Sequence, residues 1–333
     1  MFNQQRDILC AFAEWFHSDD EGAQPQQQVM TEGIQFQKLI HGARGGDDDA
    51  YIHRDDSVAA QPDQPRVAPC RPADSIVPLS GLAEASGLAV SRAVPGRLWT
   101  HNDSGEPVLF ALDARGAVAG QVRLSGASVE DWEAIAVGPC GTGSCLYVAD
   151  IGDNEAGRKR ITVYRVPEPK GVSGSIAVAE AFYATYPDGP HDAEALLIGS
   201  DGRLHIVTKG ETGPVAIYRF PAQLQSGASM RLERVGTPMA GKSDVASRIT
   251  DGAVSPDGQW AVLRTRSSLS FYRASDLLAG QWQVASRVDL TSLKEPQGEG
   301  VALGADNTVF VAGEGGGKGR QGTFARFTCS PKG

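Results

Sequence analysis

The same short pattern occurs three times in the chain, as Tyr164-Arg165-Val166-Pro167, Tyr218-Arg219-Phe220-Pro221 and Tyr272-Arg273-Ala274. Successive copies are 54 residues apart. One interval earlier, Phe110 lies in a short apolar run, and one interval later a similar run includes Phe324 and Phe327. Self-similarity at a fixed period is the signature of a repeat architecture, and five copies are visible here.

A second pattern marks the start of each unit: an acidic or small residue leads into a short apolar run. The five instances are Glu84 and Ser86 before 87–90, Glu133 before 134–137, Glu194 before 195–198, Asp251 before 252–254 and Glu299 before 300–303. Two or three further apolar runs follow in each unit, bounded by Gly, Pro, Asp and Asn, which is typical of short strands and hairpins.

Repeats of this length with about four strands each predict an all-β fold, the β-propeller, in which neighbouring blades bury one another's faces. A β-solenoid would have shorter repeats. The last unit supplies only three strands, and an additional strand at 74–79 precedes the first unit, so it can complete the last blade and close the ring. We therefore expect five four-stranded blades; six remain possible if the long unit between Glu133 and Glu194 contains an extra half blade.

The first part of the chain has a different composition. Residues 1–68 contain the run Gln26 to Gln28, the run Asp47 to Asp49 and no sustained period of 2 or 3.6, which predicts a loosely ordered N-terminal tail. Residues 69–333 form the predicted propeller domain. The tail histidines His17, His41 and His53 match no metal-ligand spacing and are interpreted as solvated residues.

Charge and hydropathy exclude several classes of protein. The 40 acidic and 31 basic residues give a net charge of −9, which would repel a nucleic acid backbone. No run approaches the roughly 18 apolar residues of a transmembrane helix. The start of the chain shows no signal-peptide pattern, because Asp7 follows Arg6 directly and Glu14 interrupts the apolar run from Ile8. We expect a monomer without a transmembrane span.

The cysteines test the propeller topology. Cys140 ends the first strand of its blade and Cys145 begins the second, so one hairpin places them together. Cys329 ends the last strand, and Cys70 shortly precedes the strand expected to pair with it. We predict disulfides Cys140–Cys145 and Cys70–Cys329, with Cys10 left over. Two disulfides imply an oxidising compartment, so we expect a periplasmic or secreted protein although no export signal is visible.

The propeller topology also predicts a functional site. Loops before the first strand and after the second strand of every blade meet at one mouth of the channel, where they gather acidic and amide side chains. The predicted metal site comprises Glu133, Glu194, Asp251, Glu299, Asp103, Asp153 and Asn154. Carboxylate and amide oxygens suit Ca²⁺, so calcium is the expected cofactor and a small-molecule or surface ligand the expected partner. Alternatively, these acids cap strand ends by binding backbone N–H groups.

Other motifs are weaker. The glycine-rich run 313–319 lacks the full pattern of a phosphate-binding loop and is interpreted as a flexible loop. Ser104 and His101 have the residue types of a nucleophile and a base, but the spacing assures no third group. Neither G-x-S-x-G nor H-E-x-x-H occurs.

Six segments together resemble a group of largely uncharacterised exported bacterial β-propeller proteins: 131–136, 150–154, 163–169, 192–196, 255–258 and 296–299. The resemblance covers about residues 72–329. More distantly, the chain resembles the propellers of the phytase and esterase-like class, which implies calcium-dependent hydrolysis of phosphoesters or other esters, although the catalytic residues of that class do not map onto this chain. The alternative is a non-catalytic exported propeller that binds a ligand or protein through the same mouth.

Overall fold

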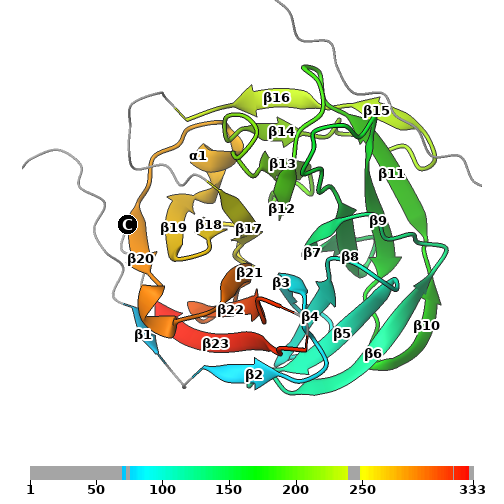
Figure 1. Ribbon diagram of the computed structural model, residues 1–333. Helices are drawn as coiled ribbons and strands as arrows, with labels where there is room; N and C mark the ends of the chain where they lie inside the picture. The colour runs from blue at the N-terminus through cyan, green and yellow to red at the C-terminus, as the bar shows by residue number, and fades with distance from the viewer. Residues whose placement is uncertain (1–69, 73–75, 239–247, 318, 330–333) are drawn as a thin grey trace, which may run out of the picture. The chain divides into compact units, whose positions relative to one another are not determined.

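The structure, a computed structural model, describes residues 70–72, 76–238, 248–317 and 319–329. Its described strands form five sheets that follow one another around a ring (Figure 1). Each sheet is one blade, and its first strand lies nearest the centre. The innermost strands of blades 1 to 5 are β3 (Ala85–Val90), β7 (Trp132–Cys140), β12 (Ala193–Ile198), β17 (Ile249–Val254) and β21 (Gln297–Leu303). The prediction of an all-β propeller with five blades is confirmed.

Within a blade, consecutive strands pair antiparallel from the centre outward. The second and third strands are β4 (Arg97–Asn102) and β5 (Val108–Asp113), β8 (Gly143–Asp150) and β9 (Ile161–Pro167), β13 (Leu204–Thr208) and β14 (Ile217–Arg219), β18 (Trp260–Thr265) and β19 (Ser268–Arg273), and β22 (Thr308–Glu314) and β23 (Gly322–Cys329). The repeated Tyr-Arg pattern lies on the third strand of blades 2, 3 and 4, so its three copies occupy equivalent places in successive blades.

The outer strands are less regular than the inner ones. Four blades have a fourth antiparallel strand from their own repeat: β6 (Val118–Ser125), β11 (Glu180–Thr185), β16 (Glu233–Gly236) and β20 (Ser286–Asp289). A short helix, α1 (Ala274–Leu278), and a 3-10 turn, η1 (Thr291–Leu293), flank β20 along the chain.

Two additional strands connect neighbouring blades. β10 (Ser173–Ala177) leaves blade 2 and pairs in parallel with β6 of blade 1, and β15 (Ser229–Arg231) leaves blade 3 and pairs in parallel with β11 of blade 2. The extra length between Glu133 and Glu194 therefore contains this connecting strand and no additional half blade.

The ring is closed by the first described strands of the chain. β1 (Cys70–Pro72) and β2 (Val77–Leu79) both pair antiparallel with β23, and Cys70 lies opposite Cys329 in register. Disulfides Cys70–Cys329 and Cys140–Cys145 are both present, with Cα atoms 4.0 and 5.3 Å apart. The predicted closure and both predicted disulfides are confirmed. The predicted tail, residues 1–68, and Cys10 lie outside the described residues.

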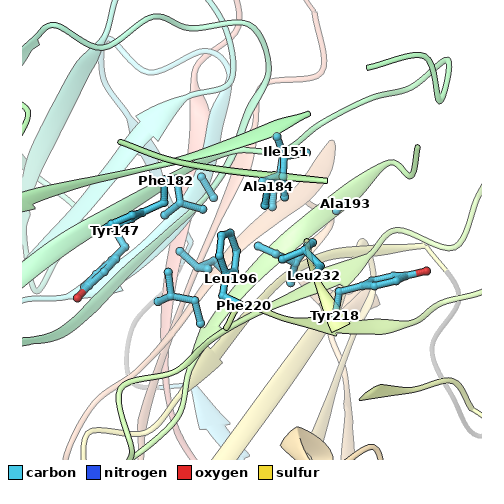
Figure 2. Close-up of a cluster of buried hydrophobic side chains, with 14 of the residues drawn as sticks. Tyr147, Ile151, Phe182, Ala184, Ala193, Leu196, Tyr218, Phe220 and Leu232 are labelled. Carbon is cyan, nitrogen blue, oxygen red and sulfur yellow. The ribbon is translucent and has the colours of Figure 1, made fainter. Parts of the chain in front are cut away.

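The hydrophobic core is divided among the contacts between blades. Among the described residues, five clusters of buried apolar side chains each join two neighbouring blades. In the cluster between blades 2 and 3, Phe182 and Tyr147 of blade 2 face Leu196 and Phe220 of blade 3 (Figure 2). A blade therefore buries its faces only when both neighbours are in place.

The described helices include none with the length and hydropathy that crossing a bilayer requires.

Candidate functional site

Every innermost strand carries a β-bulge near its first residue. In each of the five pairs of first and second strands, the register shifts by one residue at the same place in the blade. The extra residue is Gly87 in blade 1, Glu133 in blade 2, Glu194 in blade 3, Thr250 in blade 4, and Glu299 or Gly300 in blade 5. A bulge redirects the side chain at the extra residue, and bulges are frequent beside functional sites.

Four of the five bulged positions, those of blades 2 to 5, contribute a side chain to one polar cavity, which we call the mouth cavity. It has a volume of about 260 Å³ and receives side chains from all five blades, so it lies on the axis of the ring. Its lining comprises Asp103, Asp131, Glu133, Asn154, Glu194, Lys209, Glu211, Arg248, Thr250, Arg266, Gln297, Glu299 and Glu314. Seven of these residues are acidic and three are basic. The mouth cavity is therefore acidic, as the sequence predicts.

Glycine occupies the bulged position of blade 1 because no side chain fits there. Gly87 has φ +52°, and a Cβ atom on it would lie 2.8 Å from Nε2 of His101 and 2.9 Å from the backbone nitrogen of Ile135. Its neighbour Ser86 instead donates its hydroxyl to the backbone oxygen of Glu133 at 3.0 Å. Thr250 in blade 4 makes the equivalent bond to the backbone oxygen of Glu299, at 3.2 Å. These bonds fix two of the bulged glutamates relative to the preceding blade.

Lys209, which follows β13, occupies the centre of one group of acids. Its Nζ lies 2.5 Å from Oε1 of Glu194, 3.4 Å from Oδ2 of Asp192 and 3.5 Å from Oδ1 of Asn154. Burial alone would lower the pKa of Lys209, but the charges of Glu194, Asp192 and Glu133 outweigh it and raise the pKa above its ordinary value. Lys209 therefore remains charged and takes the place that a bound cation would occupy between these carboxylates.

Glu133 and Glu194 hold protons more strongly than isolated glutamates. Burial, followed by the charges of Glu194 and Asp131, raises the pKa of Glu133 well above its ordinary value. Burial raises the pKa of Glu194 to about 8, with Lys209 opposing the shift and Glu299 adding to it. Carboxyl groups so close together in a buried place cannot all be ionised, and these titrate as a coupled group.

A second group of acids lies where blades 5 and 1 meet. Burial raises the pKa of Glu314 to about 7, and the charges of Glu299, Asp103 and Glu84 add to this. Burial and Glu84 similarly raise the pKa of Asp103 to about 6. Oδ1 of Asp103 is buried and has no hydrogen-bond partner among the described residues. This group has no basic residue in the position that Lys209 occupies in the first.

The three basic side chains of the mouth cavity differ in their partners. Lys209 is paired as described above, and Arg248 lies 2.8 Å from Glu211 at the exposed rim. Arg266, in the loop between β18 and β19, is exposed and makes no ion pair or side-chain hydrogen bond with any described residue. Burial raises the pKa values of Glu299 and Glu314, and the positive charge of Arg266 opposes both shifts.

Five of the seven predicted metal-site residues line the mouth cavity: Glu133, Glu194, Glu299, Asp103 and Asn154. The amide of Asn154 joins Lys209 to Asp131, because its Nδ2 also donates to Oδ2 of Asp131 at 3.4 Å.

Asp251 lies outside the lining of the mouth cavity. Its side chain is completely buried and accepts the backbone N–H groups of Gly252 and Val301, both at 2.7 Å. Burial raises its pKa, and these two donors oppose the shift. The bulge places Thr250, one residue earlier, at the position that Glu133 and Glu194 occupy, and successive residues of a strand point to opposite faces. Asp251 therefore fits the alternative interpretation of these acids, in which the carboxylate binds backbone N–H groups and does not bind a metal.

The carboxylate of Asp153 also accepts hydrogen bonds from backbone N–H groups. It accepts the N–H groups of Gly157 and Arg158, both at 2.8 Å, and its own N–H donates to Oδ1 of Asp192 at 2.8 Å. These bonds shape the loop after β8 and hold it against blade 3. Asp153 thus positions Asn154, its neighbour in the chain.

The acidic side chains of the mouth cavity are candidate metal ligands. No group of three or more His, Cys, Asp and Glu side chains in the described part of the chain has an arrangement that could hold a metal. Lys209 already neutralises the acids around Glu194. The calcium site stays a prediction, and none of Asp103, Glu299 and Glu314 forms an ion pair with a described basic residue.

Ser104 and His101 do not form a catalytic pair. The hydroxyl of Ser104 donates to Oε2 of Glu84 at 2.7 Å, whereas His101 is completely buried, and burial lowers its pKa to about 4. The predicted metal site did not include the other residues that line the mouth cavity, which are Asp131, Lys209, Glu211, Arg248, Thr250, Arg266, Gln297 and Glu314.

The opposite half of the innermost strands is apolar. Side chains including Leu88, Val137, Leu196, Ala253 and Leu303 line a much smaller cavity, of about 40 Å³.

Comparisons with known proteins complete the description of the site. No protein family model and no curated protein sequence matches the chain. Among solved structures, the chain is similar to the PQQ-bound form of an aldose sugar dehydrogenase from Streptomyces coelicolor, with 14% identity, a TM-score of 0.46 and coverage of 80% of this chain and 99% of that one. It is also similar to the hydrazine synthase of Kuenenia stuttgartiensis, with 19% identity, a TM-score of 0.36 and coverage of 70% and 56%. Neither similarity bears on function.

Proposed function

We propose that this propeller binds, in its mouth cavity, a small ligand that carries positive charge. The observation that carries the proposal is the lining itself, in which seven carboxyl groups and three basic groups surround one cavity of about 260 Å³. Bringing carboxylates together in a partly buried place is unfavourable unless protons or cations relieve their repulsion. Lys209 relieves one group, and the group of Asp103, Glu299 and Glu314 is left for a ligand.

Raised pKa values support the same proposal. Glu314 and Asp103 hold their protons more strongly than free carboxyl groups because water and protein cations do not fully compensate their charge. A bound cation would compensate it and release those protons. An organic ammonium group fits this role better than a metal ion, because Asp103, Glu299 and Glu314 do not have the arrangement of a metal-binding group.

The test is a thermal unfolding series of the full chain at pH 7.5 with CaCl₂, MgCl₂ or cadaverine. A ligand that binds only the folded chain raises the melting temperature by mass action, and at 100 times its Kd the stabilisation is about 2.7 kcal/mol. We expect at least one of these cations to raise it.

The double substitution Glu299→Gln with Glu314→Gln should abolish that rise. Glu233→Gln is the matched control, because Glu233 is 62% exposed and pairs with Arg219 on the outer strands. Unchanged melting temperatures with all three cations would contradict the proposal, as would equal responses of the double variant and the control.

A second candidate function, ester hydrolysis, is favoured by one feature of the mouth cavity. Burial raises the pKa of Glu194 to about 8 and that of Glu133 well above its ordinary value, so the cavity contains carboxyl groups that suit a general acid. Phosphoesters, lactones and simple esters, each with and without calcium, would test it. Turnover that Glu133→Gln removes would establish hydrolysis, and a panel without turnover would leave the binding function.

We also propose that the protein is exported to an oxidising compartment, because the ring closure includes the Cys70–Cys329 disulfide. Thiol alkylation of protein taken directly from its native cells should label neither Cys70 nor Cys329. Labelling of both would contradict export.

A further inference from the structure

The charges of the mouth cavity are divided between blades. Blade 4 contributes Arg248, Thr250 and Arg266 to the lining and no carboxyl group, whereas each of the other four blades contributes at least one acid. The asymmetry arises because the bulged residue of β17 is Thr250, where β7 and β12 have a glutamate, and because the acid beside it, Asp251, binds backbone N–H groups. The mouth cavity therefore has one basic side among acidic ones.

Arg266 is the basic group on that side that is available to a ligand. It makes no ion pair or side-chain hydrogen bond with the residues that the structure describes, while Arg248 and Lys209 are both paired with acids. A guanidinium group presents parallel N–H donors that match the two oxygens of a carboxylate. Arg266 can therefore hold a carboxylate without breaking an existing contact.

The acids Asp103, Glu299 and Glu314 of the same cavity require a positively charged partner. Glu314, Asp103 and Glu299 line the same cavity, the charges of Glu299 and Asp103 add to the rise that burial causes in the pKa of Glu314, and Oδ1 of Asp103 is buried without a described partner. An ammonium group supplies both a positive charge and three N–H donors. One ligand that carries an ammonium and a carboxylate would thus satisfy Asp103 and Arg266 together.

We propose that the ligand of the mouth cavity is a small zwitterion of amino-acid or dipeptide size, with its carboxylate on Arg266 and its ammonium group on Asp103, Glu299 and Glu314. This inference rests on the proposed function and makes it specific. A cavity of about 260 Å³ is slightly smaller than the roughly 300–1,000 Å³ of pockets for drug-sized ligands, which favours a compact molecule.

The test uses sets of three matched probes and isothermal titration calorimetry of the full chain at pH 7.5. L-Alanine is compared with ethylamine, which lacks the carboxylate, and with propionate, which lacks the amine. 6-Aminohexanoate is compared in the same way with pentylamine and hexanoate, because the two zwitterions differ in the separation of their charges. We expect one zwitterion to bind at least about 10-fold more tightly than its amine, as one charge-assisted hydrogen-bond pair implies.

Arg266→Gln should abolish the preference, so that the zwitterion and its amine bind equally. The side chain of Arg266 has no described partner, so the variant should keep the melting temperature of the unsubstituted chain. Arg115→Gln is the matched control, because Arg115 is exposed in the turn after β5, away from the mouth cavity. It should leave the preference unchanged.

Equal affinities for a zwitterion and its amine in the unsubstituted chain would overturn the inference and leave the proposed function intact. Failure of both zwitterions to bind, while calcium, magnesium or cadaverine still raises the melting temperature, would do the same. Failure of every probe and every cation would overturn both. A preference that survives in Arg266→Gln would also overturn the inference, because another residue would then hold the carboxylate.

Discussion

The carboxylate of Asp251 in blade 4 accepts the backbone N–H group of Val301 in blade 5 at 2.7 Å. The same carboxylate accepts the N–H group of Gly252 in its own strand. Asp251 therefore joins the innermost strands of two blades and is completely buried. A side chain in this position stabilises the ring and has no surface on which to meet a ligand.

Asp251→Asn is expected to destabilise the fold by about 1–3 kcal/mol, because an amide nitrogen would face a backbone N–H group and leave buried donors without a partner. Urea unfolding measures the effect. Asp276→Asn, in the first turn of α1, is the control and should change little. Normal stability combined with loss of cation binding would instead place Asp251 in the binding site.

The stability of the fold is expected to fall as the pH rises from about 6.5 to 8. Burial raises the pKa of Glu194 to about 8 and that of Glu314 to about 7, so the stability linked to their protonation is complete below the unfolded value near 4.5 and is lost as the pH rises through the folded values. The buried His101 and His205, with pKa values of about 4, act in the opposite direction but only below about 6.5.

Melting temperatures between pH 6.5 and 8.5 test this dependence, and Glu194→Gln should reduce its slope. A melting temperature that rises across this range would contradict the prediction, because ionisation of the mouth carboxyl groups would then not destabilise the fold.

The two disulfides are expected to contribute unequally. By the chain-entropy model, a bridge across a sequence separation of 259 contributes about 5 kcal/mol, and a bridge across a separation of 5 about 2 kcal/mol. Denaturant unfolding of Cys70→Ser with Cys329→Ser and of Cys140→Ser with Cys145→Ser compares them. If the second pair of substitutions cost more than the first, the long bridge would not be closing the ring in the way described.

A buried ion pair joins blade 4 to blade 5. Arg264 is fully buried, and its Nη2 lies 2.5 Å from Oε2 of Glu295. Its Nη1 donates to the backbone oxygens of Gly300 and Ala312. Glu295→Gln leaves the guanidinium without its counter-ion and should cost about 3–5 kcal/mol. Glu233→Gln breaks an exposed pair and should cost less than about 1 kcal/mol. Similar costs for both would mean that Arg264 finds another acceptor.

A chain that begins at Val67 is expected to fold with a cooperative unfolding transition, because it keeps β1, β2 and all four disulfide cysteines. A chain that begins at residue 80 lacks the strands that pair with β23 and should lose cooperativity. Circular dichroism during heating compares the two. An unfolded chain from Val67, with the full chain folded, would assign a structural role to the first 66 residues.

The periodic features of this chain could be predicted from its sequence. The Tyr-Arg spacing predicted the repeat, because residues one period apart occupy the same place in each blade. The strand before the first repeat predicted the closure, and the cysteines followed from it. β10 could not be predicted, because its pairing with a neighbouring blade has no counterpart in the period of the repeat.

The mouth cavity was only partly predictable for a local reason. A bulge adds one residue, and the side chains after it change faces. Whether Thr250 or Asp251 faces the mouth cavity therefore depends on the position of the bulge, which the apolar pattern does not indicate. Lys209 presents a different difficulty. The distance between Lys209 and Glu194 depends on how β12 and β13 pair at the mouth. The number of residues that separates Lys209 from Glu194 in the sequence does not indicate this distance.

The pairing of β1 and β2 with β23 also has a consequence for synthesis. β1 and β2 leave the ribosome before their partner β23, and the innermost strands of all five blades lie between them in the chain. The nascent chain must therefore hold unpaired strand edges until β23 emerges, while blades 1 to 4 can begin to assemble in order. Completion of the ring depends on contacts between the most distant described strands, and contacts of such high sequence separation are expected to form slowly.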